Sequence, residues 1–452
     1  MNVKSNIDFF IADFKNNKDK PAIIWEDEVI SYNQIVTRID YWREKLSDIK
    51  PTTIVGLEGD FSPETISILF VLIEKNSIVV PLDINHSDKN KKKINIAQLQ
   101  IIIRVKSEND IEINSIENNQ QLNELYKTII ENNSPGLVLF TSGSSGEPKA
   151  ALHDFSKLLD KFKTKRKALK TINFLLFDHW GGLNTLFHIL SCGGTIVILD
   201  NRKPDYVCEL IEKHEVELLP TSPTFLNLLL MSRAYKDRDL SSLKIISYGA
   251  EPMPENLLNH LNLVFPHVKL QQTYGLIELG VMRSKSEDNN SLWVKIGGEG
   301  FETRVVDSLL QVKSDSAMIG YLNAESPYTE DGWFKTGDSV EVKGEYFKIL
   351  GRKSEIINVG GEKVFPQEVE NVILEMSEIS DVIVYGEDNR ITGKIVCAKI
   401  SYTGDEPKSE LIKKIKIHCR IKLEPFKVPV KIEFSESTFE NDRFKKNRMD
   451  GK

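Results

Sequence analysis

Short apolar runs alternate with longer amphipathic segments through the middle of this chain, from about residue 134 to 275. Such alternation is typical of strands that lie parallel in a sheet and are joined by covering helices. The clearest helical pattern is Ser222–Met231, with apolar side chains at Phe225, Leu226, Leu229 and Leu230. The predicted strands are Leu137–Phe140, Asn173–Phe177, Thr195–Leu199, Glu217–Leu219, Ile245–Tyr248 and Leu270–Gln272.

The same alternation occurs once earlier and then gives way to other patterns. The earlier stretch predicts a strand, a helix, a strand, a helix and a strand at Ala22–Trp25, Tyr32–Leu46, Thr53–Leu57, Ser62–Lys75 and Ser77–Pro81. After Leu292 short β-like segments follow one another, as in Phe301–Val306, Leu309–Lys313 and Glu345–Leu350. Beyond Gly351 the order is helix, strand, strand, helix and strand, at Pro366–Met376, Asp381–Tyr385, Lys394–Ile400, Lys408–Leu423 and Pro429–Phe434.

These patterns predict two domains within 452 residues, which is more than one hydrophobic core usually supports. The first, residues 1–351, is a large α/β domain with layered, largely parallel sheets, helices and a β-rich subdomain. The second, residues 352–452, is a small α+β domain. The polar, lysine-rich stretch Asp83–Lys93 is predicted to be a solvated loop or helix start.

Composition narrows the class of protein. A net charge of −7 gives no general attraction to nucleic acid or to acidic membranes, so a small-molecule enzyme is favoured. The four cysteines are scattered through apolar surroundings without metal-site spacing, and we expect buried thiols. Neither a signal peptide nor a run of eighteen apolar residues is found, so the chain is predicted to be cytoplasmic with no membrane span.

A hydroxyl- and glycine-rich loop follows the predicted strand Leu137–Phe140. Glycine lets the backbone approach an anion closely, hydroxyl groups donate hydrogen bonds, and a lysine adds positive charge. The loop is therefore predicted to bind a triphosphate. A Walker loop needs four residues between its glycines, whereas here two intervene, which disfavours a P-loop NTPase. The predicted phosphate-binding residues are Thr141, Ser142, Gly143, Ser144, Ser145, Gly146 and Lys149.

Four further clusters follow this loop in order along the chain: Gly249–Glu251, Tyr274–Glu278, Asp331–Asp338 and Gly351–Lys363. Together the five motifs resemble those of the adenylate-forming, AMP-binding enzyme superfamily. The resemblance runs from about residue 20 to 450 and is greatest to stand-alone acyl- or aryl-CoA synthetases and ligases that load acyl carrier proteins. It implies that a carboxylic acid reacts with ATP and Mg²⁺ to form an acyl-adenylate. The acyl group then passes to CoA or to the phosphopantetheine of a separate carrier protein.

The resemblance also implies roles for single residues. Gly249, Ala250 and Glu251 would flank adenine together with Tyr274 and Gly275. Glu278 would hold magnesium, which prefers one or two carboxylates plus phosphate oxygens. Asp338 and Arg352 would contact the ribose, and an ion pair between them is the competing interpretation. The small domain would be mobile and carry a catalytic lysine, so the predicted catalytic residues are Lys445, Glu278 and Thr141.

The C-terminal lysine motif departs from the family pattern. Lys445 and Arg448 take the lysine and arginine positions, but Phe444 replaces glycine and Lys446 competes for the role of Lys445. Ile277 stands where the family commonly has threonine. Loss of that hydroxyl donor would cost roughly 1–3 kcal/mol if nothing replaces it. By resemblance, Gly360 and Gly361 would line the tunnel through which the thiol enters.

The acid itself is indicated by Phe177–Asn184, which matches one wall of the acyl pocket in CoA ligases. His179, Gly275 and Leu276 are the predicted substrate contacts. Asp178 is a candidate partner for an α-ammonium group, but the register favours a fatty or aromatic acid without one. The alternatives are an amino-acid-activating enzyme, a ligase or luciferase-type enzyme that shares only adenylation, and a degenerate nucleotide-binding homologue without turnover.

Overall fold

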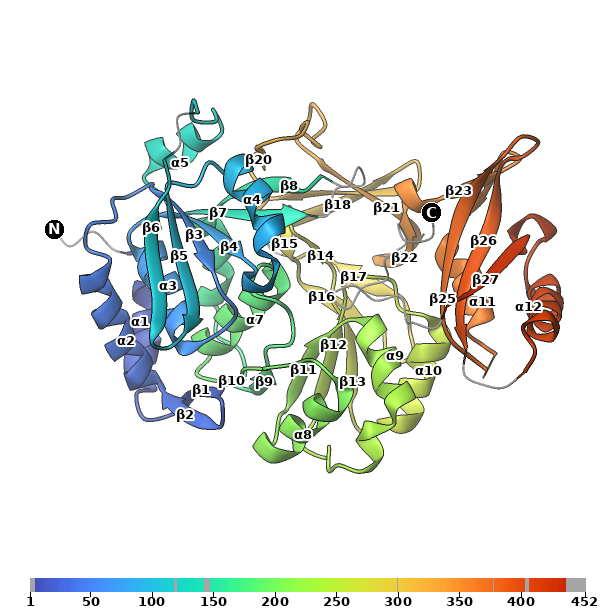
Figure 1. Ribbon diagram of the computed structural model, residues 1–452, viewed down its shortest axis with the longest axis horizontal. Coiled ribbons are helices and arrows are strands. Elements are labelled where there is room, and N and C mark those ends of the chain that lie inside the picture. The colour runs from blue at the N-terminus through green and yellow to red at the C-terminus, as the bar shows by residue number, and fades with distance from the viewer. Residues whose placement is uncertain are drawn as a thin grey trace.

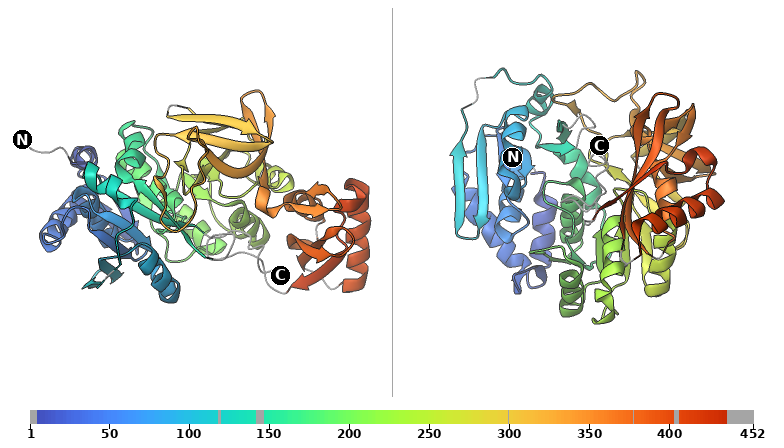
Figure 2. Two further views of the ribbon diagram at one scale, coloured as in Figure 1. Left: turned by 90° about the horizontal axis from the view of Figure 1, so that it is seen from above. Right: turned by 45° about the vertical axis from the view of Figure 1, so that its right-hand side comes forward.

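The computed structural model describes residues 5–117, 120–141, 147–298, 300–376, 378–402 and 406–435, with side chains throughout except at 87–89. Three sheets form a large body, and a small fourth unit lies at one end of the molecule (Figures 1 and 2). The predicted class, an α/β domain with layered sheets and a β-rich part before a small α+β domain, is confirmed. The boundary after Gly351 stays a prediction, since β22 (Tyr346–Arg352) includes both Gly351 and Arg352.

The first sheet has seven strands in the order β20-β8-β7-β4-β3-β5-β6. Its strands β3, β4, β5 and β7 are parallel, and β3 and β4 are buried along their whole length. Helix α3 begins at its cap Ser62 and is buried from Pro63 to Ile73, because other elements enclose it on all sides. The strands are β3 (Ile54–Glu58), β4 (Ile78–Leu82), β5 (Ile101–Ser107), β6 (Asp110–Ser115), β7 (Gly136–Thr141), β8 (Lys149–Asp154) and β20 (Gly320–Tyr321). The helices of this part are α1 (Asp8–Asn16), α2 (Tyr32–Lys45), α3 (Pro63–Glu74), α4 (Ser87–Ile96), α5 (Tyr126–Asn132) and α6 (Phe155–Leu159).

The second sheet also has seven strands, in the order β13-β12-β11-β9-β10-β1-β2, and all but β2 are parallel. Short helices cover it, as the alternating pattern predicts. The strands are β1 (Pro21–Trp25), β2 (Glu28–Ser31), β9 (Lys170–Ile172), β10 (Thr195–Val197), β11 (Leu218–Thr221), β12 (Ile245–Tyr248) and β13 (Lys269–Gln272). The helices are α7 (Trp180–Ser191), α8 (Pro204–His214), α9 (Pro223–Ser232) and α10 (Glu255–Val264).

The predicted strand Asn173–Phe177 is wrong, because the strand is β9 and ends at Ile172. The residues after Ile172 form a loop, and they are apolar because side chains of this loop point into the core. Phe174 packs on Phe225 with ring centroids 4.4 Å apart, and Phe177 packs edge-on against Phe61. The stretch Asp83–Lys93 contains a helix start as predicted, since it forms a 3-10 turn and most of α4, but Lys93 is buried and not solvated.

The third sheet is antiparallel and six-stranded, in the order β16-β17-β22-β21-β19-β18. It contacts the second sheet where β16 lies beside β13, and the short hairpin of β14 (Gly275–Leu276) and β15 (Gly280–Val281) connects β13 with β16 in the chain. Its own apolar cluster includes Tyr274 and Phe334. The remaining strands of this sheet are β16 (Ser284–Ser286), β17 (Val294–Ile296), β18 (Phe301–Val306), β19 (Leu309–Ser314) and β21 (Phe334–Lys343).

The small unit after β22 has its own sheet and its own core. Its helix α11 (Pro366–Ile373) ends three residues before the predicted end at Met376. The sheet consists of β23 (Ile357–Val359), β24 (Glu362–Val364), β25 (Ile379–Asn389), β26 (Gly393–Tyr402) and β27 (Lys431–Ser435), and α12 (Lys408–Lys422) packs with α11. The apolar cluster inside joins side chains from Ile357 to Leu423.

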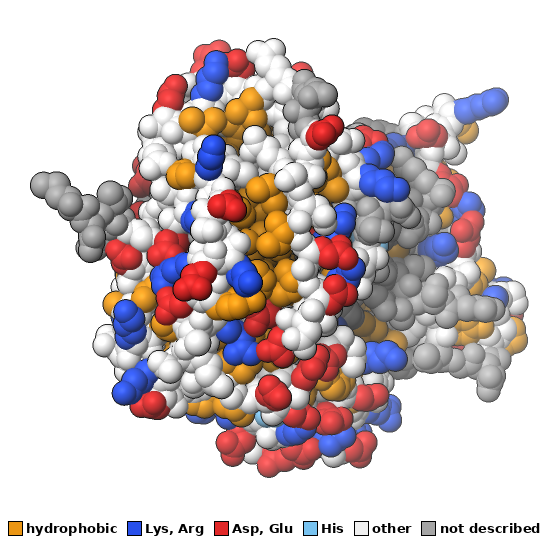
Figure 3. All heavy atoms as spheres, turned by 60° about the vertical axis from the view of Figure 1, so that its left-hand side comes forward, with side chains coloured by type: hydrophobic (Ala, Val, Ile, Leu, Met, Phe, Trp, Pro, Cys, Tyr) orange, Lys and Arg blue, Asp and Glu red, His pale blue; other side chains and the backbone are white. Residues whose placement is uncertain are grey.

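The structure also tests the predictions about membrane spans, surface charge and buried cysteines. No helix in the described ranges is long and apolar enough to span a membrane. Acidic and basic side chains are interspersed over the face in Figure 3. Cys208, Cys397 and Cys419 are buried thiols as predicted, whereas Cys192 is partly exposed, because it lies just past the end of α7.

Candidate functional site

Three of the predicted nucleotide contacts meet in one cluster, in which Tyr274 and Asp338 are buried and Arg352 is exposed. Asp338 on β21 lies directly opposite Arg352 on β22, and its Oδ1 is 2.9 Å from Arg352 Nε. The hydroxyl of Tyr274, which follows β13, donates to Asp338 Oδ2 at 2.6 Å. Tyr274 is 7% exposed and Asp338 is 5% exposed. The structure therefore joins Tyr274, Asp338 and Arg352, and the predicted ion pair is present.

Burial and charge set the protonation of this cluster. Burial and then the charge of Asp338 raise the pKa of Tyr274 well above its usual value, so Tyr274 stays a hydrogen-bond donor. Burial disfavours the charged form of Arg352, but the charge of Asp338, followed by that of Glu278, outweighs it and raises the Arg352 pKa. The guanidinium is therefore fixed as a cation beside the carboxylate of Asp338.

Glu278 lies in the turn between β14 and β15 and forms a second cluster. The hydroxyl of Tyr321 donates to Glu278 Oε1 at 2.6 Å, and the Met318 backbone N–H donates to the Glu278 carbonyl at 2.8 Å. Because β20 pairs with β8, Tyr321 also lies beside Lys149, whose Nζ is 5.5 Å from the centre of the Tyr321 ring. No local pattern in the sequence marks Tyr321, since its position depends on the pairing of β20 with β8, whose residues lie more than 160 positions earlier in the chain.

The two ends of the predicted phosphate loop are held next to each other. Thr141, the last residue of β7, pairs with Lys149, the first residue of β8. Asn323 supports the second end: its Oδ1 accepts from the Ala150 N–H and its Nδ2 donates to the Pro148 carbonyl, both at 2.9 Å. The rest of the loop, Ser142, Gly143, Ser144, Ser145 and Gly146, lies outside the described residues. So do Phe444, Lys445, Lys446 and Arg448.

Gly249, Ala250 and Glu251 follow β12 at the carboxyl edge of the second sheet. A Cβ on Gly249 would lie 2.5 Å from Thr273 Oγ1. The segment after β12 therefore approaches the segment after β13 so closely that only glycine fits here. Ala250 has a left-handed φ of 72°, which turns the chain sharply after the strand. Glu251 Oε1 accepts from the Thr224 N–H at the start of α9 at 2.8 Å.

Gly360 and Gly361 form the turn between β23 and β24 on the small domain. Both have positive φ, 61° and 95°, and both are exposed. No heavy atom lies within 4 Å of a Cβ built on either glycine. These two glycines are therefore presented on an open turn of the small domain.

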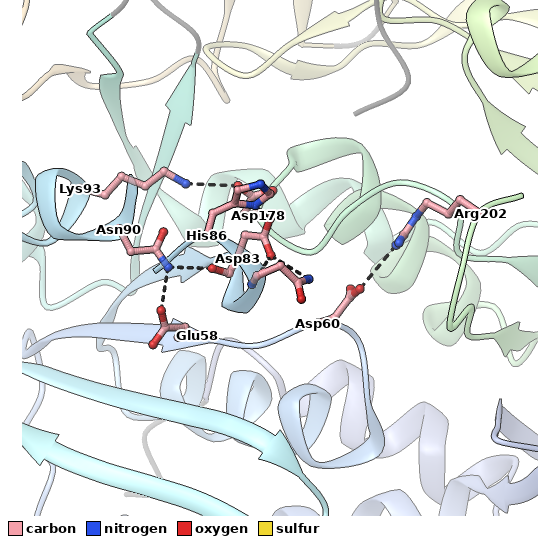
Figure 4. A network of polar contacts seen from close by, with 9 residues as sticks. Glu58, Asp60, Asp83, His86, Asn90, Lys93, Asp178 and Arg202 are labelled. Carbon is pink, nitrogen blue, oxygen red and sulfur yellow. Dashed lines mark hydrogen bonds and ion pairs between the residues drawn. The ribbon is translucent and has the colours of Figure 1, made fainter. Parts of the chain in front are cut away.

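The predicted acid contacts lie at the beginning of α7. His179 caps this helix, and its Nδ1 accepts from the Gly181 N–H at 3.1 Å. Asp178 is 5% exposed and its Oδ2 lies 3.4 Å from Lys93 Nζ (Figure 4). Lys93 Nζ is also 5.7 Å from the ring centre of Phe140, next to the phosphate loop. Asp178 is therefore already paired with the ammonium group of Lys93.

A polar network next to Asp178 and Lys93 connects α4 with residues that follow β3 and β4 (Figure 4). Asn90 on α4 donates to Glu58 Oε1 and to the Asp83 carbonyl, both at 2.7 Å. Asp60 Oδ2 is 3.6 Å from Arg202 Nη2, and burial, which Arg202 partly offsets, raises the Asp60 pKa. The network fixes α4 against the carboxyl ends of β3 and β4.

A cavity of about 610 Å³ opens between the large body and the small domain. Its walls come from α9 and α10 on one side and from the end of α11 and the start of β25 on the other, and Glu251 lies in the wall. Two side-chain amides bridge the domains beside it. Asn227 donates to the Ser380 carbonyl at 3.2 Å, and Asn256 donates to the Leu374 carbonyl at 2.9 Å.

Comparison with known proteins places this arrangement in a family. The model of the AMP-binding enzyme family matches residues 10–322, and that of the AMP-binding enzyme C-terminal domain matches residues 368–445. The chain belongs to the AMP-binding enzyme family. This membership confirms the resemblance found in the five sequence motifs.

Curated relatives share part of the chain at low identity. Indoleacetate–CoA ligase from Aromatoleum aromaticum is 29% identical over 59% of this chain and 57% of its own length. A 2-succinylbenzoate–CoA ligase from Bacillus licheniformis is 27% identical over 66% of this chain and 65% of its own length. The chain thus spans less than two thirds of the length of these relatives.

Solved structures match over almost the whole chain. The anthranilate CoA ligase AuaEII in complex with anthranoyl-AMP has a TM-score of 0.81 and 18% identity, and the match covers 99% of this chain and 96% of that one. ATP-bound MatB from Rhodopseudomonas palustris has a TM-score of 0.79 and 19% identity, with 97% of each chain covered. At these identities the likeness shows the fold.

Proposed function

We propose that this protein is an AMP-forming acid–thiol ligase. It joins a carboxylic acid to the α-phosphate of ATP, releases pyrophosphate, and passes the acyl group of the acyl-adenylate to the thiol of CoA. The observation that carries this proposal is the Tyr274–Asp338–Arg352 cluster, which lies with the Glu278–Tyr321–Lys149 cluster beside the ends of the phosphate loop. A buried carboxylate with a planar ring next to it suits a nucleoside, and a lysine suits its phosphates.

The chain's own residues would orient and neutralise two anions that repel each other. Asp338 has oxygens that can each accept a ribose hydroxyl, and Tyr274 and Arg352 hold the carboxylate in place. Lys149 and the loop donors would bind the phosphates, and Lys445 would bridge the acid and the α-phosphate. Fixed positive charge of this kind, aimed at charge that develops in the transition state, typically contributes about 3–4 kcal/mol per group.

The residues present suit a magnesium ion held jointly with ATP. Within the described ranges no group of three or more His, Cys, Asp or Glu side chains could hold a metal by itself. Glu278 offers Oε2, since Oε1 accepts from Tyr321, and one carboxylate plus phosphate oxygens and water is the usual Mg²⁺ set. When bound, Mg²⁺ would neutralise charge on the leaving pyrophosphate. Glu278 would fix the side from which the ion binds.

The acid is proposed to be a fatty or aromatic acid without an α-amino group. Asp178, which would have to pair with an α-ammonium, already has Lys93 Nζ 3.4 Å away. The relatives named for indoleacetate and 2-succinylbenzoate support an aromatic acid. His179, Gly275 and Leu276 would line this pocket, with the His179 ring fixed by its bond to Gly181.

The acceptor is proposed to be CoA, with a separate carrier protein as the second candidate, since relatives are named CoA ligases. The small domain, beginning after Gly351, would then turn so that Gly360 and Gly361 approach the thiol. Their open turn has room for such an approach, because nothing lies within 4 Å of a Cβ at either residue.

Acid-dependent ATP–pyrophosphate exchange tests the proposed function. Purified full-length protein is assayed with fatty, aryl and amino acids, and AMP release is then measured with and without CoA. We expect exchange with a fatty or aryl acid, and AMP release that increases with CoA. Lys445→Ala should lower exchange by about a hundred- to a thousandfold with ATP affinity nearly unchanged.

Lys446→Ala is the matched control and should keep most of the exchange. If Lys446→Ala loses exchange and Lys445→Ala does not, the catalytic lysine is reassigned. Exchange only with amino acids would instead make the chain an amino-acid-activating enzyme. ATP binding without exchange for any acid would refute the ligase proposal.

A further inference from the structure

Helix α7 has one polar face inside an otherwise apolar core. Trp180, Asn184 and His188 follow one another at intervals of four residues and so lie on the same face. Within the helix only Asn184 and His188 keep part of their surface exposed, and the other residues are buried. The indole Nε1 of Trp180 is buried without a hydrogen-bond partner, although Trp180 is only 1% exposed. A buried donor without a partner is costly, so the Trp180 N–H is available to a ligand that accepts a hydrogen bond.

Lys161 reaches over this face from the 3-10 helix η2 (Asp160–Lys163). Its Nζ donates to the Val281 carbonyl at 3.0 Å and lies 5.6 Å from the centre of the Trp180 ring. One hydrogen bond leaves two of the three N–H groups of the ammonium. Burial, and then the charge of Arg166, lower the Lys161 pKa to about 7. The site therefore carries an excess of donors.

The charge that acts on Lys161 among the described residues is positive, since it comes from Arg166. Burial, then Arg166 and Lys161, lower the His188 pKa to about 4, so His188 is a neutral ring with one N–H donor. Two acidic residues in or beside the helix η2 have other partners: Asp160, next to Lys161 in the chain, pairs with Lys163, and Asp13 pairs with Lys165. Among the described residues no carboxylate lies within 4 Å of Lys161 Nζ. The cluster is thus complementary to an anion.

The cluster adjoins the proposed acid pocket. Val281, which binds Lys161, is paired with Gly275 across the β14–β15 hairpin, and Gly275 directly follows Tyr274. A Cβ on Gly280, in the same hairpin, would lie 3.1 Å from the unpartnered Nε1 of Trp180. The other wall is α7, whose first turn carries His179. An acid bound along the hairpin, with its reacting carboxyl towards Tyr274, would have its far end near Lys161.

We propose that Lys161, His188 and Trp180 bind a second carboxylate, at the end of the substrate remote from the carboxyl group that is activated. The substrate class is then the dicarboxylic acids. This inference rests on the proposed ligase function and narrows its substrate. A purely structural role for Lys161 would need only the bond to Val281 and would leave the Trp180 donor and the one-sided charge without a purpose.

Matched acids test this subsite. Exchange is measured with pairs that share a carbon skeleton, such as hexanoate with adipate, octanoate with suberate, and phenylacetate with its ring-carboxylated analogues. Binding of the same acids to the protein without ATP is measured by calorimetry. We expect the dicarboxylic member of at least one pair to be preferred by about tenfold or more, as one charge-assisted hydrogen bond implies.

Lys161→Met should abolish that preference, with a loss for the dicarboxylic acid at least about tenfold greater than for the monocarboxylic acid, because methionine keeps the length of the side chain and removes its charge. Lys163→Met, on the same 3-10 helix and exposed, should keep the preference. Equal use of both members by the wild type, or an equal loss for both in Lys161→Met, would overturn the subsite. Absence of exchange with every acid would refute the ligase function instead, and the calorimetric comparison would still decide the subsite.

Discussion

Single residues in this protein owe their chemistry to where the fold puts them. Lys161 is separated in sequence from the motifs of the active site, yet it binds the hairpin next to Tyr274. Burial lowers its pKa from the usual value of about 10.4 to about 7. Burial likewise raises the pKa of Asp338, and the charge of Arg352 and the hydroxyl of Tyr274 oppose this shift. Burial and neighbouring groups therefore decide which of these side chains carry a charge.

The pH dependence of stability reports on Lys161. The folded chain loses this proton near pH 7, whereas the unfolded chain keeps it until about pH 10.4. Between these values the unfolded state binds more protons, so Lys161 makes the free energy of unfolding rise with pH, by at most about 1.4 kcal/mol per unit. In Lys161→Met this rise is absent. Urea unfolding of both proteins at pH 7 and pH 9.5 measures the difference, and parallel pH profiles would contradict the lowered pKa.

At the level of elements, close backbone contacts fix the position of α7. A Cβ on Gly182 would lie 2.3 Å from the Leu176 carbonyl oxygen and 2.6 Å from that of Leu175. The apolar run before α7 therefore folds as a loop over the first turn of the helix, with Phe174 and Phe177 buried. This contact holds the beginning of α7, which His179 caps, against the preceding loop.

Gly182→Ala should destabilise the protein by roughly 1–3 kcal/mol, because the added methyl group overlaps backbone atoms that cannot move independently. Thermal or urea unfolding measures this loss, and acid affinity should fall with it while ATP affinity is kept. Asn184→Ala, on the part-exposed face of the same helix, is the control and should change stability by less than about 0.5 kcal/mol. Similar stabilities of the two variants would show that the loop yields to the methyl group.

For the whole molecule, side-chain amides bridge the two domains. Among the described residues, and besides the segment that connects the domains, two asparagine side chains of the large body donate to backbone carbonyls of the small domain, beside a cavity of about 610 Å³. Each such bond contributes only about 0.5–1.5 kcal/mol. A joint of this kind suits a domain that turns between two steps of a reaction.

The double variant Asn227→Ala, Asn256→Ala should loosen the small domain without unfolding either core. Trypsin should then cut faster after Lys353, in the exposed segment that joins the domains. Asn262→Ala is the matched control, since Asn262 donates to carbonyls of Leu258 and Asn289 inside the large body. Equal cleavage rates in the double variant and the control would mean that other contacts hold the domains together.

Local patterns in the sequence determined most elements of this fold. Helices such as α2 and strands such as β12 agree with their predictions within a residue or two, because hydrophobic period and caps act over short distances. The run Asn173–Phe177 was mistaken for a strand, since a buried loop and a buried strand are equally apolar. The motifs likewise gave Tyr274, Glu278, Asp338 and Arg352.

Only the tertiary structure could bring separate segments together. The pairing of β20 with β8 puts Tyr321 against Glu278, and the packing of α4 puts Lys93 against Asp178. The bond from Lys161 to Val281 spans 120 residues. No local pattern encodes such contacts, because they depend on how whole sheets and helices pack. The sequence alone therefore determined the family and predicted the nucleotide contacts, and the packing decided which charges lie beside the proposed acid pocket.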